Sequence, residues 1–135
     1  MEYFWNEEIN IEELKDLFRS NDWRIPKNEI LENSFQFTWK WLSCYQEDSL
    51  IGFVRILSDG FHHAYICSMI VHKNYHNQNI GKEMMNLVLA EVKENNLAAV
   101  LVAKDEVQGF YDQFGFKNKV HDKNPLVFEF IKKIL

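Results

Sequence analysis

The sequence predicts a mixed α+β fold in which helices flank a mostly antiparallel, twisted central sheet. Two observations lead to this fold class. The spacing of apolar residues is helical near the N-terminus and changes to a period of two from Phe35 onward. A continuous apolar run at 97–103 then lies between two further helical patterns, as expected for a strand buried within a sheet.

The N-terminal part is predicted to hold a short strand and two helices. Residues 2–5 form the strand, and residues 10–20 form a helix. The apolar positions of this helix follow helical spacing: Ile11, Leu14, Leu17 and Phe18. A second, short helix is expected from about Pro26 to Leu31, because proline suits the first turn of a helix.

Three strands are expected next, as an antiparallel meander. The first has an alternating aromatic stripe, expected in the core or, with Trp23, along an acceptor pocket: Phe35, Phe37, Trp39 and Trp41. The second strand, 50–57, contains Gly52, and an interior glycine often marks a β-bulge. Asp59-Gly60 predicts a tight hairpin into the third strand, at about 62–71.

The C-terminal half should contain a long helix, a strand, a short helix and a final strand. The long helix is expected at 80–94. The strand at 97–103 should be buried on both faces, because its apolar run shows no alternation. The short helix covers 106–114 and is closed by Gly115, and the last strand covers 126–131.

Composition limits the classes of function. A chain of 135 residues with 47% hydrophobic residues predicts one domain, 1–135, with a substantial core. A net charge of −5 gives no support for a general nucleic-acid surface, and no apolar run reaches the roughly 20 residues of a membrane span. Cys44 and Cys67 lie in apolar segments and provide no disulfide framework, so the cytoplasm is expected and Cys67 is read as a small buried hydrophobe. His62-His63 lacks the further ligands of a metal site.

Residues 70–82 carry the clearest functional signal. The apolar run ends there, a polar loop follows, and a helical pattern begins directly after Asn79. The first backbone N–H groups of a helix have no partner within the helix, and the helix dipole favours negative charge. A strand that leads through a short loop into a helix therefore predicts a binding site for a phosphate or similar anion.

Two further motifs support a specific family. The loop His76–Gly81 is similar to the pattern Q/R-x-x-G-x-G/A, and Phe110-Tyr111 with Gly115-Phe116 matches F-Y-x-x-x-G-F. With the block 51–55, which resembles the third strand of that family, these motifs resemble the GNAT superfamily of acyl-CoA-dependent N-acetyltransferases. The stretch with Ser58-Asp59 and Phe110-Tyr111 is also similar to small bacterial and plastid enzymes related to arylalkylamine acetyltransferases.

The resemblance implies a role for each part of the site. Backbone groups of Met69, Ile70 and Val71 would bind the pantetheine arm and polarise the acetyl carbonyl. The pyrophosphate loop would comprise His76, Asn77, Gln78, Asn79, Ile80, Gly81 and Lys82. Tyr111 would protonate the leaving thiolate, since the pKa of tyrosine, about 10, suits an acid near neutral pH. Asp59, Glu106 or a water chain would accept the proton of the amine, and the acceptor side would include Trp23, Arg55 and Ser68.

Three residues depart from the family pattern. His76 stands where glutamine or arginine is usual, Asn79 where glycine is usual, and Ser68 where many relatives carry an acidic side chain. Asparagine tolerates left-handed backbone angles and is also a good helix N-cap. If Asn79 caps its own helix, its side chain competes with the phosphate for the same N–H groups.

The resulting hypothesis is an enzyme that transfers acetyl from acetyl-CoA to a primary amine in a ternary complex. A small-molecule acceptor is favoured, such as an arylalkylamine or a polyamine, with a protein N-terminus or lysine as the second choice. A homodimer is a family expectation. The alternative from another class is a non-catalytic acyl-CoA-binding or sensor module, which Ser68 and Asn79 motivate, and a third is an interaction protein without cofactor.

Overall fold

In the computed structural model of the protein, the described residues are 1–118 and 131–133. The helices are α1 (Ile11–Ser20), α2 (Asn28–Gln36), α3 (Ile80–Glu94) and α4 (Gln108–Asp112), with short 3₁₀ helices at Lys73–Tyr75 and Asp105–Val107. The strands are β1 (Glu2–Trp5), β2 (Lys40–Gln46), β3 (Ser49–Ser58), β4 (His63–Val71), β5 (Ala98–Val102), β6 (Lys117–Asn118) and β7 (Ile131–Lys133). This mixed α+β architecture confirms the fold class that the sequence predicts.

The described strands form one sheet of seven, in the order β1-β2-β3-β4-β5-β7-β6. Neighbouring strands run antiparallel except β4 and β5, which are parallel. The meander of three strands expected from the sequence is therefore present as β2, β3 and β4. A parallel pair needs a crossover connection, and α3 provides it.

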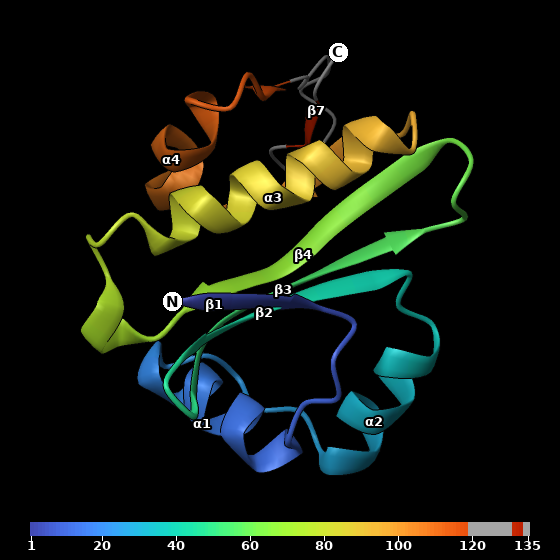
Figure 1. Ribbon diagram of the computed structural model, residues 1–135. Coiled ribbons are helices and arrows are strands. Elements are labelled where there is room, and N and C mark those ends of the chain that lie inside the picture. The colour runs from blue at the N-terminus through green and yellow to red at the C-terminus, as the bar shows by residue number, and fades with distance from the viewer. Residues whose placement is uncertain (119–130, 134–135) are drawn as a thin grey trace.

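Helices cover both faces of the sheet, with α3 and α4 on one face and α1 and α2 on the other (Figure 1). Each face has its own apolar core. Under α3, Met84, Met85 and Val88 are fully buried, and on the opposite face Leu14 and Leu17 of α1 are buried against Phe53. The four buried or packed positions of α1 match the spacing predicted for residues 10–20, and Asn10 caps this helix by accepting from the N–H groups of Glu12 and Glu13.

The region around Phe35 differs from the sequence prediction. The second helix continues to Gln36 rather than ending near Leu31, and β2 begins only at Lys40. Leu31 and Phe35 lie four residues apart, so both face the sheet from one side of α2, and Phe35 packs edge-on against Trp41 at 4.9 Å between ring centroids. The prediction that the aromatic alternation forms one strand from Phe35 is therefore wrong: Phe35 belongs to α2, and Phe37 lies between α2 and β2 and is 81% exposed.

Two C-terminal expectations also change. The strand at 97–103 is not buried on both faces, because alternate residues of β5 are buried and Val102 is 46% exposed. The helix expected at 106–114 is a 3₁₀ turn followed by the five residues of α4. Gly115 follows with a φ of +86°, the left-handed conformation expected of a C-cap glycine. The final strand predicted at 126–131 lies outside the described residues except for Ile131, where β7 begins.

Gly52 allows α3 to pack closely on the sheet. A Cβ atom added there would lie 2.7 Å from the Sδ atom of Met84 and 3.1 Å from the Cβ of Cys44. The pairing register with β2 also shifts between Cys44 and Tyr45, opposite this glycine. Gly52 therefore stands beside an irregularity of the sheet, as predicted, and its lack of a side chain allows the short distance between α3 and β3. No helix in the described part of the chain is long and apolar enough to span a membrane.

Candidate active site

The sheet divides where the parallel pair ends. Pairing between β4 and β5 stops at Ile66 and Leu101, whereas β4 continues to Val71. His72 N–H donates to the carbonyl of Ile51 in β3, so the N–H and carbonyl of Val71 point to the opposite side, toward the division. Beyond Ile66, no described strand pairs with this edge of β4.

A bulge in β4 lies at the point of division. Phe53 pairs with Ile70 and Arg55 with Cys67, so two residues of β4, Ser68 and Met69, oppose one residue of β3. Ser68 has a φ of +54°, a left-handed conformation that serine adopts rarely. Pairing between β4 and β5 ends just before this bulge. Its only local sign in the sequence is a serine within an apolar run.

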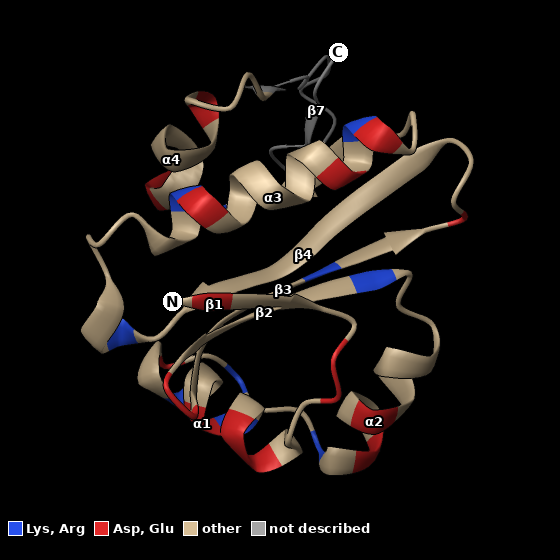
Figure 2. Ribbon diagram, in the orientation of Figure 1, with Lys and Arg blue, Asp and Glu red and all other residues tan. Residues whose placement is uncertain are grey.

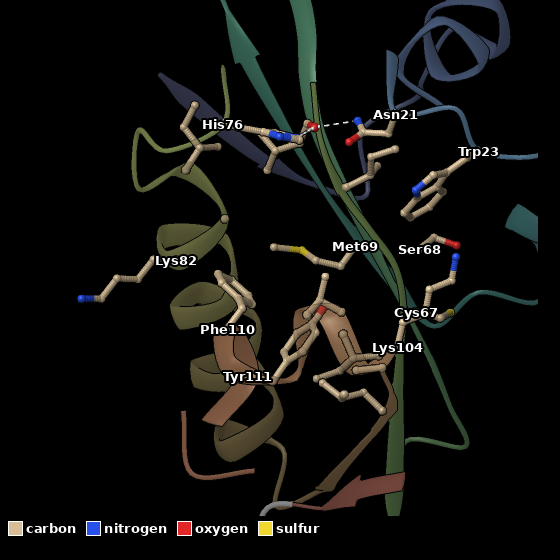
Figure 3. A pocket seen from close by; sticks show the side chains of 18 of the residues that line it. Asn21, Trp23, Cys67, Ser68, Met69, His76, Lys82, Lys104, Phe110 and Tyr111 are labelled. Carbon is tan, nitrogen blue, oxygen red and sulfur yellow. Dashed lines mark hydrogen bonds between the residues drawn. The ribbon is translucent and has the colours of Figure 1, made fainter. Parts of the chain in front are cut away.

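A cavity of about 1120 Å³ occupies the division between the two strands. One wall is the loop between α1 and α2, a second is the loop and first turn of α3, and a third is formed by the end of β5 and by α4. Figure 3 shows this arrangement, with Lys82 on the side of α3 and with Trp23, Cys67 and Ser68 on the other side. Because the cavity crosses the plane of the sheet, elements from both faces contribute to it.

The loop before α3 and the first turn of this helix line the cavity. Asn77 and Asn79 both have a φ of 63°, and the side chain of Asn79 makes no capping hydrogen bond to α3. Asn79 therefore takes the backbone role of a glycine and does not occupy the free N–H groups of the helix. The competition considered from the sequence is absent.

The loop that leads into α3 is tied to the N-terminal half of the chain through one carbonyl. Val71 O accepts from Asn21 Nδ2 at 2.9 Å and from His76 Nε2 at 2.8 Å. A dashed line in Figure 3 marks the hydrogen bond from Asn21. A carbonyl only accepts, so Nε2 of His76 carries a proton. Ser20 Oγ also accepts from the N–H of Lys73 at 3.2 Å. The end of α1 and the start of the α3 loop are thus held together across β4.

Tyr111 projects from α4 into the cavity, below Met69 in Figure 3. Its ring packs edge-on against Phe110 at 5.0 Å between centroids, and Phe110 in turn lies close to Gly81, where an added Cβ would stand 3.4 Å from Phe110 Cζ. Burial raises the pKa of Tyr111 to about 12. Tyr111 therefore remains a protonated hydrogen-bond donor, held against the first turn of α3.

Most of the chain matches the model of one protein family. Residues 3–116 match the model of the acetyltransferase (GNAT) family. The chain belongs to the GNAT family. GNAT acetyltransferases use acetyl-CoA as the acyl donor.

Relatives of known sequence and structure agree with this family. An uncharacterized N-acetyltransferase, ycf52, of Gracilaria tenuistipitata var. liui is 27% identical over 117 residues, which are 83% of this chain and 64% of the relative. The chain thus spans somewhat less than two thirds of that relative. A protein of unknown function from meticillin-resistant Staphylococcus aureus superposes with a TM-score of 0.80 at 21% identity, over 96% of this chain and 100% of the other. An aminoglycoside 6′-N-acetyltransferase complexed with coenzyme A gives a TM-score of 0.76 at 14% identity, over 98% and 94% of the two chains.

The cavity brings together most of the site residues predicted from the sequence, though not all. The cavity lining contains Trp23, Ser68, Met69, Ile70, Val71, His76, Asn77, Asn79, Ile80, Gly81, Lys82 and Tyr111. Gln78 is in the same loop, exposed and outside the lining. Arg55 lies behind the wall, on β3, where its Nε donates to Cys67 Sγ at 3.3 Å.

The two carboxylates proposed as bases are not brought to the cavity. Asp59 lies in the hairpin between β3 and β4, where it accepts from the N–H groups of Phe61 and His62. These hydrogen bonds lower its pKa, which suits a turn-forming carboxylate and weakens it as a base. Glu106 is exposed in the 3₁₀ turn before α4 and is not part of the lining.

The structure also adds residues that the sequence reasoning missed. Cys67 is half-buried and lines the cavity, so reading it as a buried hydrophobe was wrong. Asn21, Asp22 and Arg24 come from the loop after α1, and Lys104 follows β5. No motif marked these residues, because loops that meet only in the folded chain leave no pattern in the sequence.

Proposed function

We propose that the protein transfers the acetyl group of acetyl-CoA to the primary amine of a small molecule, by direct attack in a ternary complex. One observation carries this proposal. A cavity at the division of β4 and β5 combines an edge of β4 that no described strand covers, a helix N-terminus without a side-chain cap and a protonated tyrosine. These three features suit the acetyl transfer from acetyl-CoA that is the reaction of GNAT acetyltransferases.

The first turn of α3 fits the pyrophosphate of acetyl-CoA. Backbone N–H groups from Asn77 to Lys82 are free of side-chain caps, and the positive end of the helix dipole favours a bound anion. The left-handed conformations of Asn77 and Asn79 form the loop before a ligand arrives. Preformed loops of this kind bind with a smaller loss of conformational entropy.

The exposed edge of β4 fits the pantetheine arm and the thioester. Backbone groups of Met69 and Val71 face the cavity, and N–H donors there can stabilise the oxyanion that develops when an amine attacks a thioester. The carbonyl of Val71 already accepts two hydrogen bonds. We therefore assign the binding of this arm to N–H groups and to the carbonyl of Met69 rather than to the carbonyl of Val71.

The reaction forms one bond and breaks one. The neutral amine attacks the acetyl carbon, the C–N bond forms, the C–S bond breaks, and the proton lost from nitrogen leaves through solvent or Asp22, the one carboxylate in the described lining. Tyr111, with a pKa of about 12, is a weaker acid than an ordinary thiol at about 8.5. Complete proton transfer to the sulfur is therefore unfavourable, and we assign Tyr111 a hydrogen bond to the departing thiolate. The cytoplasm expected from the free thiols of Cys44 and Cys67 remains a prediction.

Thiol release and product mass test this proposal together. The purified protein is incubated with acetyl-CoA and a panel of primary amines, free CoA is measured with a thiol reagent, and each product is examined for a gain of one acetyl group. The proposal expects amine-dependent thiol release and an N-acetylated product. Binding of acetyl-CoA without release at any amine would favour the sensor alternative.

A further inference from the structure

Charge is distributed unevenly between the surface and the cavity. The chain has a net charge of −5, and the outer helices α1 and α2 carry mainly acidic side chains (Figure 2). The cavity has the opposite balance: Arg24, Lys82 and Lys104 line it against a single carboxylate, Asp22, among the described residues. A ligand that enters this site therefore meets net positive charge.

Two of these cations belong to the side of the cavity away from α3. Lys82 lies in the first turn of α3, on the side of the cavity that we assign to the pyrophosphate. Arg24 follows Trp23 in the loop after α1, and Lys104 follows β5, opposite the bulge of β4 if the parallel register is extended. In residues 1–118 and 131–133, neither Arg24 nor Lys104 takes part in an ion pair. Both charges are available to a ligand.

The side of the cavity away from α3 also contains a carboxylate, Asp22, and an aromatic ring, Trp23. Asp22 precedes Trp23 in the chain and lines the same wall. Trp23 stacks on Phe18 with 5.6 Å between ring centroids and an interplanar angle of 25°, and it remains 40% exposed. A fixed aromatic face beside one carboxylate and two cations matches a ligand with an apolar body, an ammonium group and a carboxylate.

We infer that the acceptor is a zwitterionic amine, an α-amino acid with an apolar or aromatic side chain. This inference rests on the proposed function and narrows its acceptor class. Asp22 orients the ammonium group, Arg24 and Lys104 bind the carboxylate, and Trp23 contacts the side chain. The two cations also favour the neutral form of the nearby amine, which is the form that attacks the thioester. A polyamine, by contrast, would place further positive charge beside Arg24 and Lys104.

A matched pair of amines tests the inference. Tryptophan and tryptamine differ only in the carboxylate, and their kcat/KM values are compared by thiol release. We expect a ratio of at least tenfold in favour of tryptophan, and spermidine should be poorer than either. Arg24→Gln and Lys104→Gln should each lower this ratio at least fivefold. Asp22→Asn should lower both values and keep the ratio within twofold, and Lys93→Gln, on the exposed last turn of α3, is the control.

Equilibrium binding separates failure of the inference from failure of the proposed function. Calorimetric titration with acetyl-CoA comes first, followed by titration of the CoA-saturated protein with N-acetyltryptophan and N-acetyltryptamine. Tighter binding of N-acetyltryptophan, lost in the Arg24 and Lys104 variants, supports the inference. Equal or tighter binding of N-acetyltryptamine overturns it and leaves the enzyme intact. An absence of acetyl-CoA binding overturns both.

Discussion

The two sides of the cavity are built in different ways. The side that we assign to acetyl-CoA consists of backbone: the exposed edge of β4, two left-handed asparagines and the first turn of α3. The acceptor side consists of side chains from two loops, among them Trp23, Arg24 and Lys104. A backbone site recognises groups common to every acyl-CoA, whereas side chains can change without altering the fold. We therefore expect the backbone side to serve any acyl-CoA and the side-chain side to determine which acceptor is bound.

The largest effect should come from Tyr111→Phe. Losing the hydrogen bond to the departing thiolate should lower kcat by about 10²–10³-fold, as for other donors to a developing anion. The affinity for acetyl-CoA should change by no more than about threefold, because the interaction develops in the transition state. Steady-state kinetics and calorimetry measure the two quantities. Tyr65→Phe, on the paired part of β4, is the control, and a kcat within threefold of the wild type would remove Tyr111 from the mechanism.

Gly52→Ala tests whether the backbone side depends on the position of α3. The new Cβ would clash with Met84 Sδ and crowd Cys44, so the free energy of unfolding should fall by about 1–3 kcal/mol. Chemical denaturation measures this value, and acetyl-CoA affinity should fall with it. Gly109→Ala is the matched control, because no atom lies within 4 Å of its added Cβ. An equal loss of stability in both variants would mean that close packing at Gly52 is not the cause.

The shared carbonyl of Val71 should couple the two sides. Asn21→Ala should mainly raise the KM of the acceptor, and His76→Ala should mainly weaken acetyl-CoA binding. Each effect should be about threefold to tenfold, the value of one hydrogen bond of about 0.5–1.5 kcal/mol. A double-mutant cycle measures the coupling, which should exceed about 0.5 kcal/mol because both donors share one acceptor. Strictly additive effects would show that the two sides act independently.

Substitutions of Asn79 should separate backbone conformation from side-chain chemistry. Asn79→Gly should leave acetyl-CoA affinity within about twofold, since glycine adopts the φ of 63° without steric cost. Asn79→Ala should weaken binding by about fivefold to thirtyfold, because a left-handed alanine costs roughly 1–2 kcal/mol. Calorimetry with acetyl-CoA gives both values. A similar loss in the two variants would point to a direct contact of the asparagine side chain.

The pH profile should show the smallest effect. Because burial raises the pKa of Tyr111 to about 12, its proton remains in place well above the ordinary tyrosine value of about 10. The rate should therefore rise with pH as the acceptor amine loses its proton, and it should not fall between pH 8 and about 10.5. Circular dichroism at each pH controls for unfolding. A descending limb near pH 10 in a folded protein would show that Tyr111 titrates normally.

The sequence predicted the backbone side far better than the side-chain side. The helix at 80–94 and the strand before it follow from apolar periodicity. The polar loop between them, which leads directly into the helix, predicts an anion site. Phe35 shows a limit of this reasoning, because it fits two patterns: it lies two residues before Phe37 in the alternation and four residues after Leu31 on the side of α2 that faces the sheet. Arg24 and Lys104 show another, since nothing local in the sequence distinguishes a lysine in a cavity from one in solvent. The bulge at Ser68 depends on the partner strand and has no clear local signal.

The most direct test of the account is a calorimetric titration of the protein with acetyl-CoA, repeated with Val102→Trp. Val102 lines the cavity on β5 and is 46% exposed, so a tryptophan there should fill the division between the strands without disturbing the core. The account predicts binding of one acetyl-CoA per chain, with a Kd between about 1 µM and 1 mM as for typical enzyme substrates, and loss of binding in the variant. No heat of binding at millimolar acetyl-CoA, or equal binding by the variant, would contradict the placement of acetyl-CoA in this cavity.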